Sequence, residues 1–388
     1  MKLRSIATLG ELRGKTVLVR VDFNGATEGS EAKLERSLSS IRYLAHRGAK
    51  IILMTHLGRP EGKVVPSLST RPLAIHLAKL LGMKIKHAGD VVGPKAKHAV
   101  AGLKNREILM LENLRFEKGE EKNESAFAKK LAAFGDVFVN DAFAVSHRAH
   151  ASVVGITKLL PSYAGVGLVQ EVQHQLHVLE ENPKHLVVAM GGAKVSTKLE
   201  VLERFLKQGT LVLIGGAMAN AFFKARGLEI GKSLAAAEDV KAAAKLLKYK
   251  NLVLPEDVVV AKRLADKSPL RMIPPTAIER DEIVVDVGLT TLCEYRAIIE
   301  QVRTIVWNGP MGVYEIPAFS HGSIMLARTV AARTQFGAFS VVGGGETLEV
   351  AQLSGMEQVF SYVSTGGGAM LEFLSGKMLP GLIPLVIK

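Results

Sequence analysis

Short apolar runs alternate with longer amphipathic stretches along this chain. Many of the runs are continuously apolar, which is typical of strands buried on both faces of a parallel sheet. The predicted strands are residues 15–23, 49–57, 107–114, 136–143, 185–192, 210–218, 251–260, 304–310 and 338–345. Stretches with helical spacing, such as 126–133 and 235–247, lie between them. The repeated β–α–β order predicts an α/β fold with two doubly wound parallel-sheet, Rossmann-like domains.

A single helix is predicted between the two halves, within residues 164–182. Its apolar stripe recurs at i, i+3, i+7 and i+10 and consists of Val169, Val172, Leu176 and Leu179. The Asn182–Pro183 step ends the pattern. The length of 388 residues suits two domains better than one. We therefore expect this helix to join the domains and to act as part of a hinge.

Composition narrows the class of protein. Apolar residues make up 48% of the chain, but no apolar stretch approaches the ~20 residues needed to cross a bilayer. The first residues lack the apolar segment of a signal peptide, so we expect a cytoplasmic protein. Cys293 is the only cysteine in the sequence, which excludes an intrachain disulfide and a cysteine-based metal site. We expect Cys293 to be a small buried hydrophobe.

The net charge of +13 is unevenly distributed. Residues 1–184 hold 28 Lys and Arg against 18 Asp and Glu, a net charge of +10, whereas residues 185–388 carry a net charge of +3. A basic first half indicates an anionic partner. The basic residues are scattered and aromatic residues are only 5%, so platforms for stacking bases are scarce. Small phosphorylated ligands fit this pattern better than nucleic acid, which stays open as an alternative.

Glycine-rich segments join strands to helices in the second half. They are residues 191–198, 343–347 and 364–370. Glycine lets backbone N–H groups approach a phosphate closely, and a helix N-terminus adds partial positive charge. Lys194 and Lys198 are four residues apart, so they are predicted to lie on one helix face and to reach the same anion. Three such segments indicate a polyphosphate site, although tight packing alone explains any single glycine pair.

In the first half, basic side chains follow the predicted strand ends or lie at loop positions. The set consists of Arg36, His56, Arg59, Arg115 and Arg148. Arginine forks match phosphate and carboxylate geometry, so this set suits a small ligand with about three negative charges. The sequence contains no GxxxxGK[ST] segment and no protein-kinase motif set, and GVG at 165–167 lacks the third glycine of a dinucleotide fingerprint. A P-loop enzyme, a protein kinase and a dinucleotide-binding protein are therefore disfavoured.

Several motifs together resemble those of the phosphoglycerate kinases. They include RVDFN, HLGRP, LENLRF, VNDAF, HRAHAS, GGAKVS, WNGPMGV and STGGGA, in the family's order from about Lys15 to Gly381. The resemblance implies a glycolytic and gluconeogenic kinase that reversibly transfers a phosphoryl group from 1,3-bisphosphoglycerate to ADP, giving 3-phosphoglycerate and ATP. It implies direct in-line transfer after hinge closure, with Mg²⁺ on the nucleotide. It also implies a monomer with small-molecule substrates and neither a membrane nor an obligate nucleic-acid partner.

The resemblance also implies a division of the chain. A phosphoglycerate-binding domain is expected to comprise residues 1–168 and the C-terminal tail 376–388. Residues 169–184 are expected to form the interdomain helix, and residues 185–375 the nucleotide-binding domain.

The same resemblance assigns roles to individual residues. The substrate-binding set is Asp22, Phe23, Asn24, Arg36, His56, Leu57, Gly58, Arg59, Arg115 and Arg148. The nucleotide-binding set is Lys198, Asn308, Pro310, Glu315, Gly344, Gly345, Glu346 and Thr347, and Glu346 is the implied contact to magnesium. The catalytic set is Arg36, Lys194, Gly345 and Gly368. Arg36 and Lys194 are expected to clamp the transferring group, a role that acts through charge neutralisation and alignment.

Some positions depart from the family pattern. Ala217 stands where glycine is usual, Leu289 where proline is usual, and Glu346 where aspartate is usual. All three are expected on the nucleotide side. They leave open a non-catalytic scaffold with weakened nucleotide binding, although retention of Arg36 and Lys194 argues against that alternative.

Overall fold

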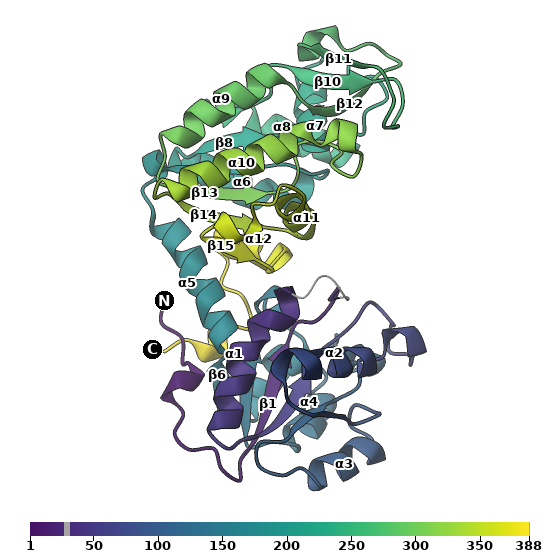
Figure 1. Ribbon diagram of the computed structural model, residues 1–388, viewed down its shortest axis with the longest axis vertical. Helices are drawn as coiled ribbons and strands as arrows, with labels where there is room; N and C mark the ends of the chain where they lie inside the picture. The colour runs from purple at the N-terminus through teal and green to yellow at the C-terminus, as the bar shows by residue number, and fades with distance from the viewer. Residues whose placement is uncertain (27–31, 388) are drawn as a thin grey trace. The chain divides into compact units, whose positions relative to one another are not determined.

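The computed structural model describes residues 1–26 and 32–387. The chain forms two compact units, Met1–Gln173 with Met378–Lys388, and His174–Lys377. Each unit contains a six-stranded parallel sheet with helices packed beside it (Figure 1). The predicted class, two parallel-sheet α/β domains, is confirmed. In the described part of the chain, no helix is long and apolar enough to pass through a bilayer.

The sheet of the first unit has the strand order β3-β4-β2-β1-β5-β6. Its strands are β1 (Thr16–Val21), β2 (Lys50–Met54), β3 (Ile85–His87), β4 (Ile108–Met110), β5 (Val137–Asp141) and β6 (Ser162–Ala164). β1 lies between β2 and β5, with Val17 opposite both Ile51 and Val137. Val17–Val21 are buried, as the continuous apolar run predicts. Because all strands run the same way, the residues that follow them meet at one edge of the sheet.

Helices cover the sheet of the first unit. They are α1 (Ala32–His46), α2 (Arg71–Leu81), α3 (Pro94–Ala101) and α4 (Ser125–Ala132). The ends of α2 follow from local sequence: Pro72 stands at its start, and Gly82 ends it in the left-handed region with φ of 65°. The chain termini meet in this unit, where Leu3 and Val386 form an antiparallel bridge (Figure 1).

The second unit is built around the strand order β15-β14-β13-β7-β8-β9. Its strands are β7 (Leu186–Met190), β8 (Leu211–Ile214), β9 (Leu252–Val253), β13 (Thr304–Asn308), β14 (Phe339–Gly343) and β15 (Tyr362–Ser364). Its helices are α6 (Leu199–Gln208), α7 (Ala217–Ala225), α8 (Ala237–Leu246), α9 (Leu289–Glu300), α10 (His321–Gln335), α11 (Gly345–Leu353) and α12 (Gly368–Leu374). Trp307 is completely buried at the centre of this core.

A second, antiparallel sheet in this unit was not predicted. It consists of β11 (Leu270–Ile273), β10 (Val258–Ala261) and β12 (Ile283–Val287). Residues 251–260 were predicted as one strand, but the structure divides them into β9 and β10. Pro255 lies between the two, and proline cannot donate a ladder hydrogen bond within a sheet.

Helix α5 (Val166–Glu180) contains the division between the units, which falls after Gln173. The predicted apolar stripe is wrong for most of its positions. The buried residues of α5 are Gly167, Leu168, Glu171, Val172, Gln175 and Val178, whereas Val169, Leu176 and Leu179 are half-buried. The apolar pattern missed this face because it includes Glu171 and Gln175, and Glu171 is buried against Arg36.

The prediction for Cys293 is also wrong, because this residue is exposed on α9. The buried residues of that helix are Thr291, Tyr295 and Ile299, so Cys293 falls between them on a different face.

Candidate active site

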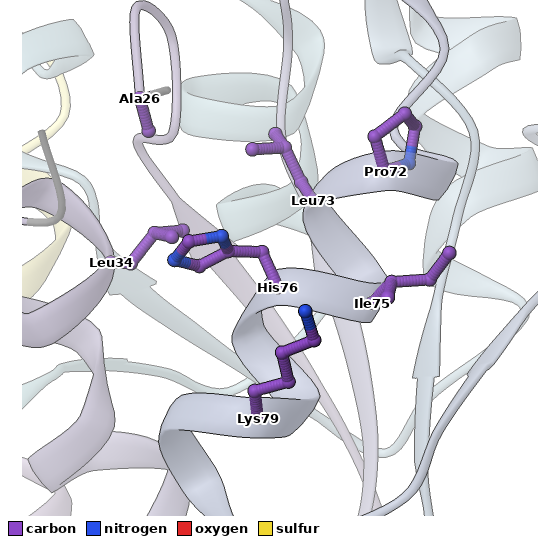
Figure 2. A pocket seen from close by; sticks show the side chains of 7 residues that line it. All are labelled: Ala26, Leu34, Pro72, Leu73, Ile75, His76 and Lys79. Carbon is purple, nitrogen blue, oxygen red and sulfur yellow. The ribbon is translucent and has the colours of Figure 1, made fainter. Parts of the chain in front are cut away.

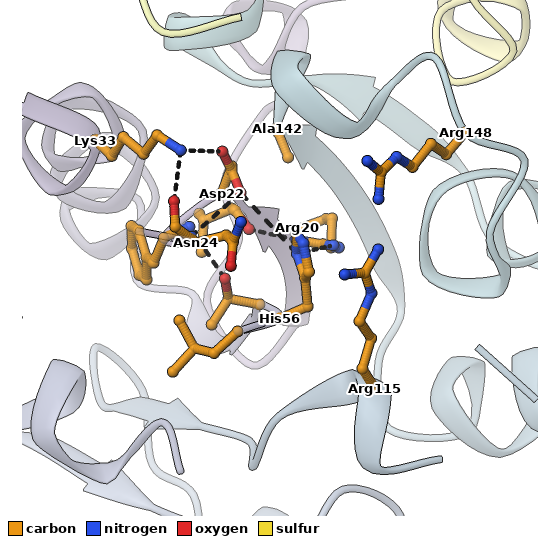
Figure 3. Close-up of polar contacts among 12 residues, drawn as sticks. Arg20, Asp22, Asn24, Lys33, His56, Arg115, Ala142 and Arg148 are labelled. Carbon is orange, nitrogen blue, oxygen red and sulfur yellow. Dashed lines mark hydrogen bonds and ion pairs between the residues drawn. The ribbon is translucent and has the colours of Figure 1, made fainter. Parts of the chain in front are cut away.

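The first unit gathers polar groups at the carboxyl edge of its sheet. Asp22 and Asn24 follow β1, and Asn24 Oδ1 accepts a hydrogen bond of 2.8 Å from the backbone N–H of Gly58, in the segment after β2. Lys33 of α1 lies 3.1 Å from Asp22 Oδ2 and also donates to the Asn24 carbonyl (Figure 3). Phe23 is buried in the core, and its backbone N–H donates to Thr55. The segments that follow β1 and β2 are thus hydrogen-bonded to each other, which fixes the geometry of this edge of the site.

Arg20 forms the buried base of this site, and the sequence analysis did not include it. It is fully buried within β1, and its Nε donates to Ser152 Oγ at 3.0 Å. Ser152 in turn donates its hydroxyl to Glu120, which is also fully buried. Burial lowers the pKa of Arg20 and raises that of Glu120, while their opposite charges counter both shifts. An arginine inside an otherwise apolar strand is the signal in the sequence that could have identified it.

Three guanidinium groups converge at this edge. Figure 3 shows Arg115 and Arg148 turned toward each other beside Arg20. Burial lowers the pKa of both Arg20 and Arg115, and the charge of Arg148 lowers both further, as that of Arg59 does for Arg115. Guanidinium groups that are held close together favour a bound anion.

The Arg115 side chain is held in place and keeps an unsatisfied donor, as suits a group that binds an anion. Its side chain is fixed by Gly58 O at 2.6 Å and by Glu121 at 3.0 Å. Within the described residues, its buried Nε atom has no hydrogen-bond partner. A buried donor without a partner costs free energy, which an anion placed here would recover.

His56 acts as a neutral donor at this site. Its Nδ1 atom lies 3.1 Å from Arg20 NH2, and because arginine cannot accept, Nδ1 must be the acceptor. The remaining proton is therefore on Nε2. Burial and the charges of Arg20, Arg115 and Arg148 lower the pKa of His56 far below its usual value. His56 is thus expected to offer an N–H group and not a positive charge.

Arg36 is placed on α1 and pairs with α5. Its NH1 atom lies 3.4 Å from Glu171 Oε1, and the Glu171 side chain is only 3% exposed. The Arg36 side chain keeps 24% of its surface exposed, so it retains access to solvent. Arg36 is therefore anchored by Glu171 while part of its side chain remains exposed.

The second unit contains a cavity of about 310 Å³ at the carboxyl edge of its parallel sheet. Its walls include apolar side chains such as Pro255, Val258 and Met311, and its rim includes the predicted Pro310, Glu315 and Glu346. Gly192, Ala193 and Gly216 also line it. An apolar cavity with a few polar groups suits a nucleotide.

The two lysines near this cavity are arranged differently from the prediction. Lys194 precedes the helix in an irregular segment and is exposed, whereas Lys198 follows in a 3₁₀ turn, Ser196–Lys198. They do not share one helix face because Gly192, with φ of 82°, turns the chain and α6 begins only at Leu199. The prediction of an i, i+4 helical pair is therefore wrong.

Lys198 is turned inward. Its Nζ donates to Gly191 O at 2.8 Å and to Asn308 O at 3.2 Å. Burial lowers the pKa of Lys198 to about 8, and the nearby charge of Glu346 counters this shift. Asn308 in turn donates its side-chain amide to Gly343 O at 2.7 Å. Lys198 is thereby held against the carboxyl ends of β7 and β13.

The start of α11 supplies the remaining predicted groups. Gly344 has φ of 103°, and a Cβ there would lie 2.9 Å from Asn308 Nδ2, so both conformation and space require glycine. Gly345 begins the helix, and Thr347 Oγ1 accepts a hydrogen bond of 2.7 Å from Gly309 N. Backbone N–H groups at this helix start are free of intrahelical partners and favour phosphate oxygens.

The donor set fits a nucleotide-bound magnesium ion. Among the described residues, no group of three or more His, Cys, Asp or Glu side chains forms a metal site. Of the carboxylates that line the cavity, Glu346 is the one beside Gly192 and Lys198. Mg²⁺ commonly binds through one or two carboxylates, substrate phosphates and water, so a single carboxylate suffices.

Three further predicted positions begin helices of the second unit. Leu289 is 58% exposed at the start of α9 and is not among the residues that line the cavity. Gly368 begins α12 after Gly367, which has φ of 51°. Ala217 begins α7 and does line the cavity.

A further hollow of about 320 Å³ lies between α1 and α2 in the first unit. Figure 2 shows the side chains of Leu34, Leu73, His76 and Lys79 around it. Ala26 also lines this hollow, and residue 27, directly after Ala26, lies outside the described part of the chain. The hollow is separate from the guanidinium cluster described above.

These features define a class. Each unit is a parallel α/β domain with an anion site at the carboxyl edge of its sheet, one built from guanidinium groups and one from a glycine-lined cavity with a buried lysine. Such a protein binds a small anion and a nucleotide, as a phosphotransferase does.

The chain belongs to the phosphoglycerate kinase family. The model of that family, described as "Phosphoglycerate kinase", matches residues 6–377. The phosphoglycerate kinase of Thermomicrobium roseum is 43% identical over 393 residues, covering 99% of each chain. The structure of phosphoglycerate kinase from Coxiella burnetii superposes with a TM-score of 0.85 at 38% identity, covering 99% of this chain and 98% of that one. The family's reaction is the reversible transfer between 1,3-bisphosphoglycerate and ADP.

Proposed function

We propose that the guanidinium cluster of the first unit binds 3-phosphoglycerate or 1,3-bisphosphoglycerate. The observation that carries this proposal is the convergence of the Arg20, Arg115 and Arg148 guanidinium groups, and the unsatisfied Nε of Arg115 supports it. Asp22 and Asn24 present polar groups beside the cluster for the hydroxyl and carboxyl groups of the ligand. His56 offers a neutral N–H donor, while Arg59 adds charge at the exposed side.

The cavity of the second unit is proposed to bind ADP or ATP. Its apolar walls would take the base, Glu315 at the rim would accept from the ribose hydroxyls, and Lys198 with the start of α11 would contact the phosphates. Lys194 is exposed and comes directly after Ala193, which lines the cavity. We propose that it contacts the phosphoryl group during its transfer. When bound, the magnesium ion neutralises phosphate charge, and Glu346 is the side chain proposed to hold it.

Transfer requires little covalent assistance from the protein, because the carboxylate is a good leaving group. The reaction instead requires that the substrates are aligned, that their charge is neutralised and that water is excluded. Each substrate belongs to one unit, so closure about the hinge is part of the proposal. Gly345 and Gly368 would add backbone N–H groups near the transferring oxygens. We also propose a cytoplasmic monomer; the wheat relative, 40% identical over 395 residues, is named as cytosolic.

Replacing Arg148 with alanine is expected to weaken 3-phosphoglycerate binding roughly 10- to 100-fold, the usual range for a lost hydrogen bond to a charged group. The measurement is calorimetric titration of the full chain with 3-phosphoglycerate. Arg13→Ala, which removes an exposed arginine of the same unit, is the matched control. Equal affinities in wild type and Arg148→Ala would mean that the ligand binds elsewhere.

Glu346→Ala is expected to raise the Mg²⁺ concentration needed for half-maximal turnover several-fold. The carboxylate is long enough to contact the ion through a metal-bound water, so Glu346→Asp should preserve the wild-type requirement or lower it. The measurement is turnover at fixed ATP with varied Mg²⁺. An unchanged Mg²⁺ requirement in Glu346→Ala would leave Glu346 with only a favourable charge at a helix start.

A further inference from the structure

Tyr314 lies at a junction between the cavity wall and the hydrophobic core of the second unit. It is 7% exposed and belongs to the core cluster that includes Leu326 of α10 and Val350 of α11. It also lines the cavity, directly before Glu315 in the chain. Any movement of the Tyr314 backbone therefore moves the side chain proposed to hold the ribose.

The hydroxyl group of Tyr314 is engaged outside the set of residues that the proposed reaction uses. It donates a hydrogen bond of 2.6 Å to Glu349 Oε2, a length typical of bonds to a charged acceptor. Burial and the Glu349 carboxylate raise the pKa of Tyr314, so the hydroxyl keeps its proton. Glu349 lies on α11, three residues after Glu346, and so about one helical turn from it.

The loop that carries Tyr314 is attached to α11 at two points. At its start, Gly309 N donates to Thr347 Oγ1 at 2.7 Å. At its end, Tyr314 donates to Glu349. Between these points, Met311 N bonds to Ser323 of α10 at 2.9 Å, which leaves the Tyr314 bond as the second direct tie to α11. The segment with Pro310 and Glu315 is thus held against the helix whose first turn carries Glu346.

We propose that the Tyr314–Glu349 pair is a positioning device that fixes the distance between the ribose end and the phosphate end of the nucleotide site. This inference rests on the nucleotide site proposed above. Glu315 marks one end and Glu346 the other, and a nucleoside diphosphate must reach both at once. The pair acts on affinity for such ligands because it holds both ends ready before binding.

The expected kinetic effects distinguish this positioning role from a contact that only stabilises the fold. Tyr314→Phe removes one oxygen atom and keeps the buried ring. It is expected to raise KM for ADP and for ATP about three- to tenfold, the usual effect of one lost hydrogen bond. kcat and KM for 3-phosphoglycerate should stay unchanged. Adenosine, which spans only one end of the site, should bind with less than a twofold change.

The test combines steady-state kinetics with calorimetric titration of ADP and adenosine on the full chain. Glu349→Gln retains an acceptor oxygen and is expected to stay near wild type, whereas Glu349→Leu should behave as Tyr314→Phe does. Tyr249→Phe is the matched control, because Tyr249 donates to Glu203 in the same unit and does not line the cavity. Its KM for nucleotides should equal that of wild type.

Two outcomes would overturn the inference alone: unchanged nucleotide KM in Tyr314→Phe, or equal losses for ADP and adenosine. A lower unfolding temperature with normal KM would likewise reduce the pair to a structural contact. A wild-type protein that bound no ADP would instead contradict the proposed nucleotide site itself. The wild-type titration therefore tells the two failures apart.

Discussion

Lys194→Ala and Arg36→Ala are each expected to lower kcat about 10²–10³-fold, the usual loss when one donor to a transition state is removed. Both side chains keep exposed surface in the structure, and both are expected to act mainly on the transferring group. An interaction made mainly in the transition state lowers kcat with little change in substrate affinity. KM and the dissociation constant for ADP should therefore change much less than kcat.

Steady-state kinetics and nucleotide titration of both variants test this expectation, with exposed Lys245→Ala of α8 as the control for the lysine. Arg36 needs an additional control, because its loss leaves buried Glu171 without this ion pair. The double variant Arg36→Ala/Glu171→Gln removes that buried charge. If either single variant, correctly folded, kept near-full turnover, the proposed clamp would be wrong.

Arg20→Met is expected to destabilise the first unit by about 3–5 kcal/mol, since it leaves Glu120 as a buried charge without its counter-ion. It also removes the donor to His56 Nδ1, so the orientation and tautomer of that ring are no longer fixed. Binding of 3-phosphoglycerate should fall together with stability. Denaturant unfolding and ligand titration measure the two effects.

The double variant Arg20→Met/Glu120→Gln separates these two causes. Removing the second charge should recover much of the unfolding free energy, because no uncompensated ion remains buried. It should not recover ligand binding, because His56 still lacks its partner. Full recovery of binding in the double variant would show that Arg20 serves folding only.

The fold could be predicted in outline because buried parallel strands leave a clear mark in sequence. Runs such as that around Val187 are continuously apolar, and the glycine-rich segments 191–198 and 343–347 begin at the ends of two such runs. The antiparallel sheet was missed because its edge strand β11 is only four residues long, is interrupted by Arg271 and is exposed for most of its length. Pro255 also divided a run that had seemed continuous.

Candidate site residues could be predicted where polar or charged side chains come directly after strands, since parallel topology brings the ends of those strands together. His56 and Arg115 were identified in this way, and the structure shows both near Arg20. The charge state of His56 was not predictable, because it depends on a hydrogen bond from a residue 36 positions away in the chain. The separate placements of Lys194 and Lys198 depend on where a helix begins, which spacing alone does not determine.

The central claim is tested most directly by a coupled assay of ATP-dependent 3-phosphoglycerate phosphorylation with the purified, folded chain. The account predicts turnover that requires both substrates and Mg²⁺ and that falls about 10²–10³-fold in Lys194→Ala. A clean and correctly folded preparation that shows no turnover above that of Lys194→Ala would contradict it.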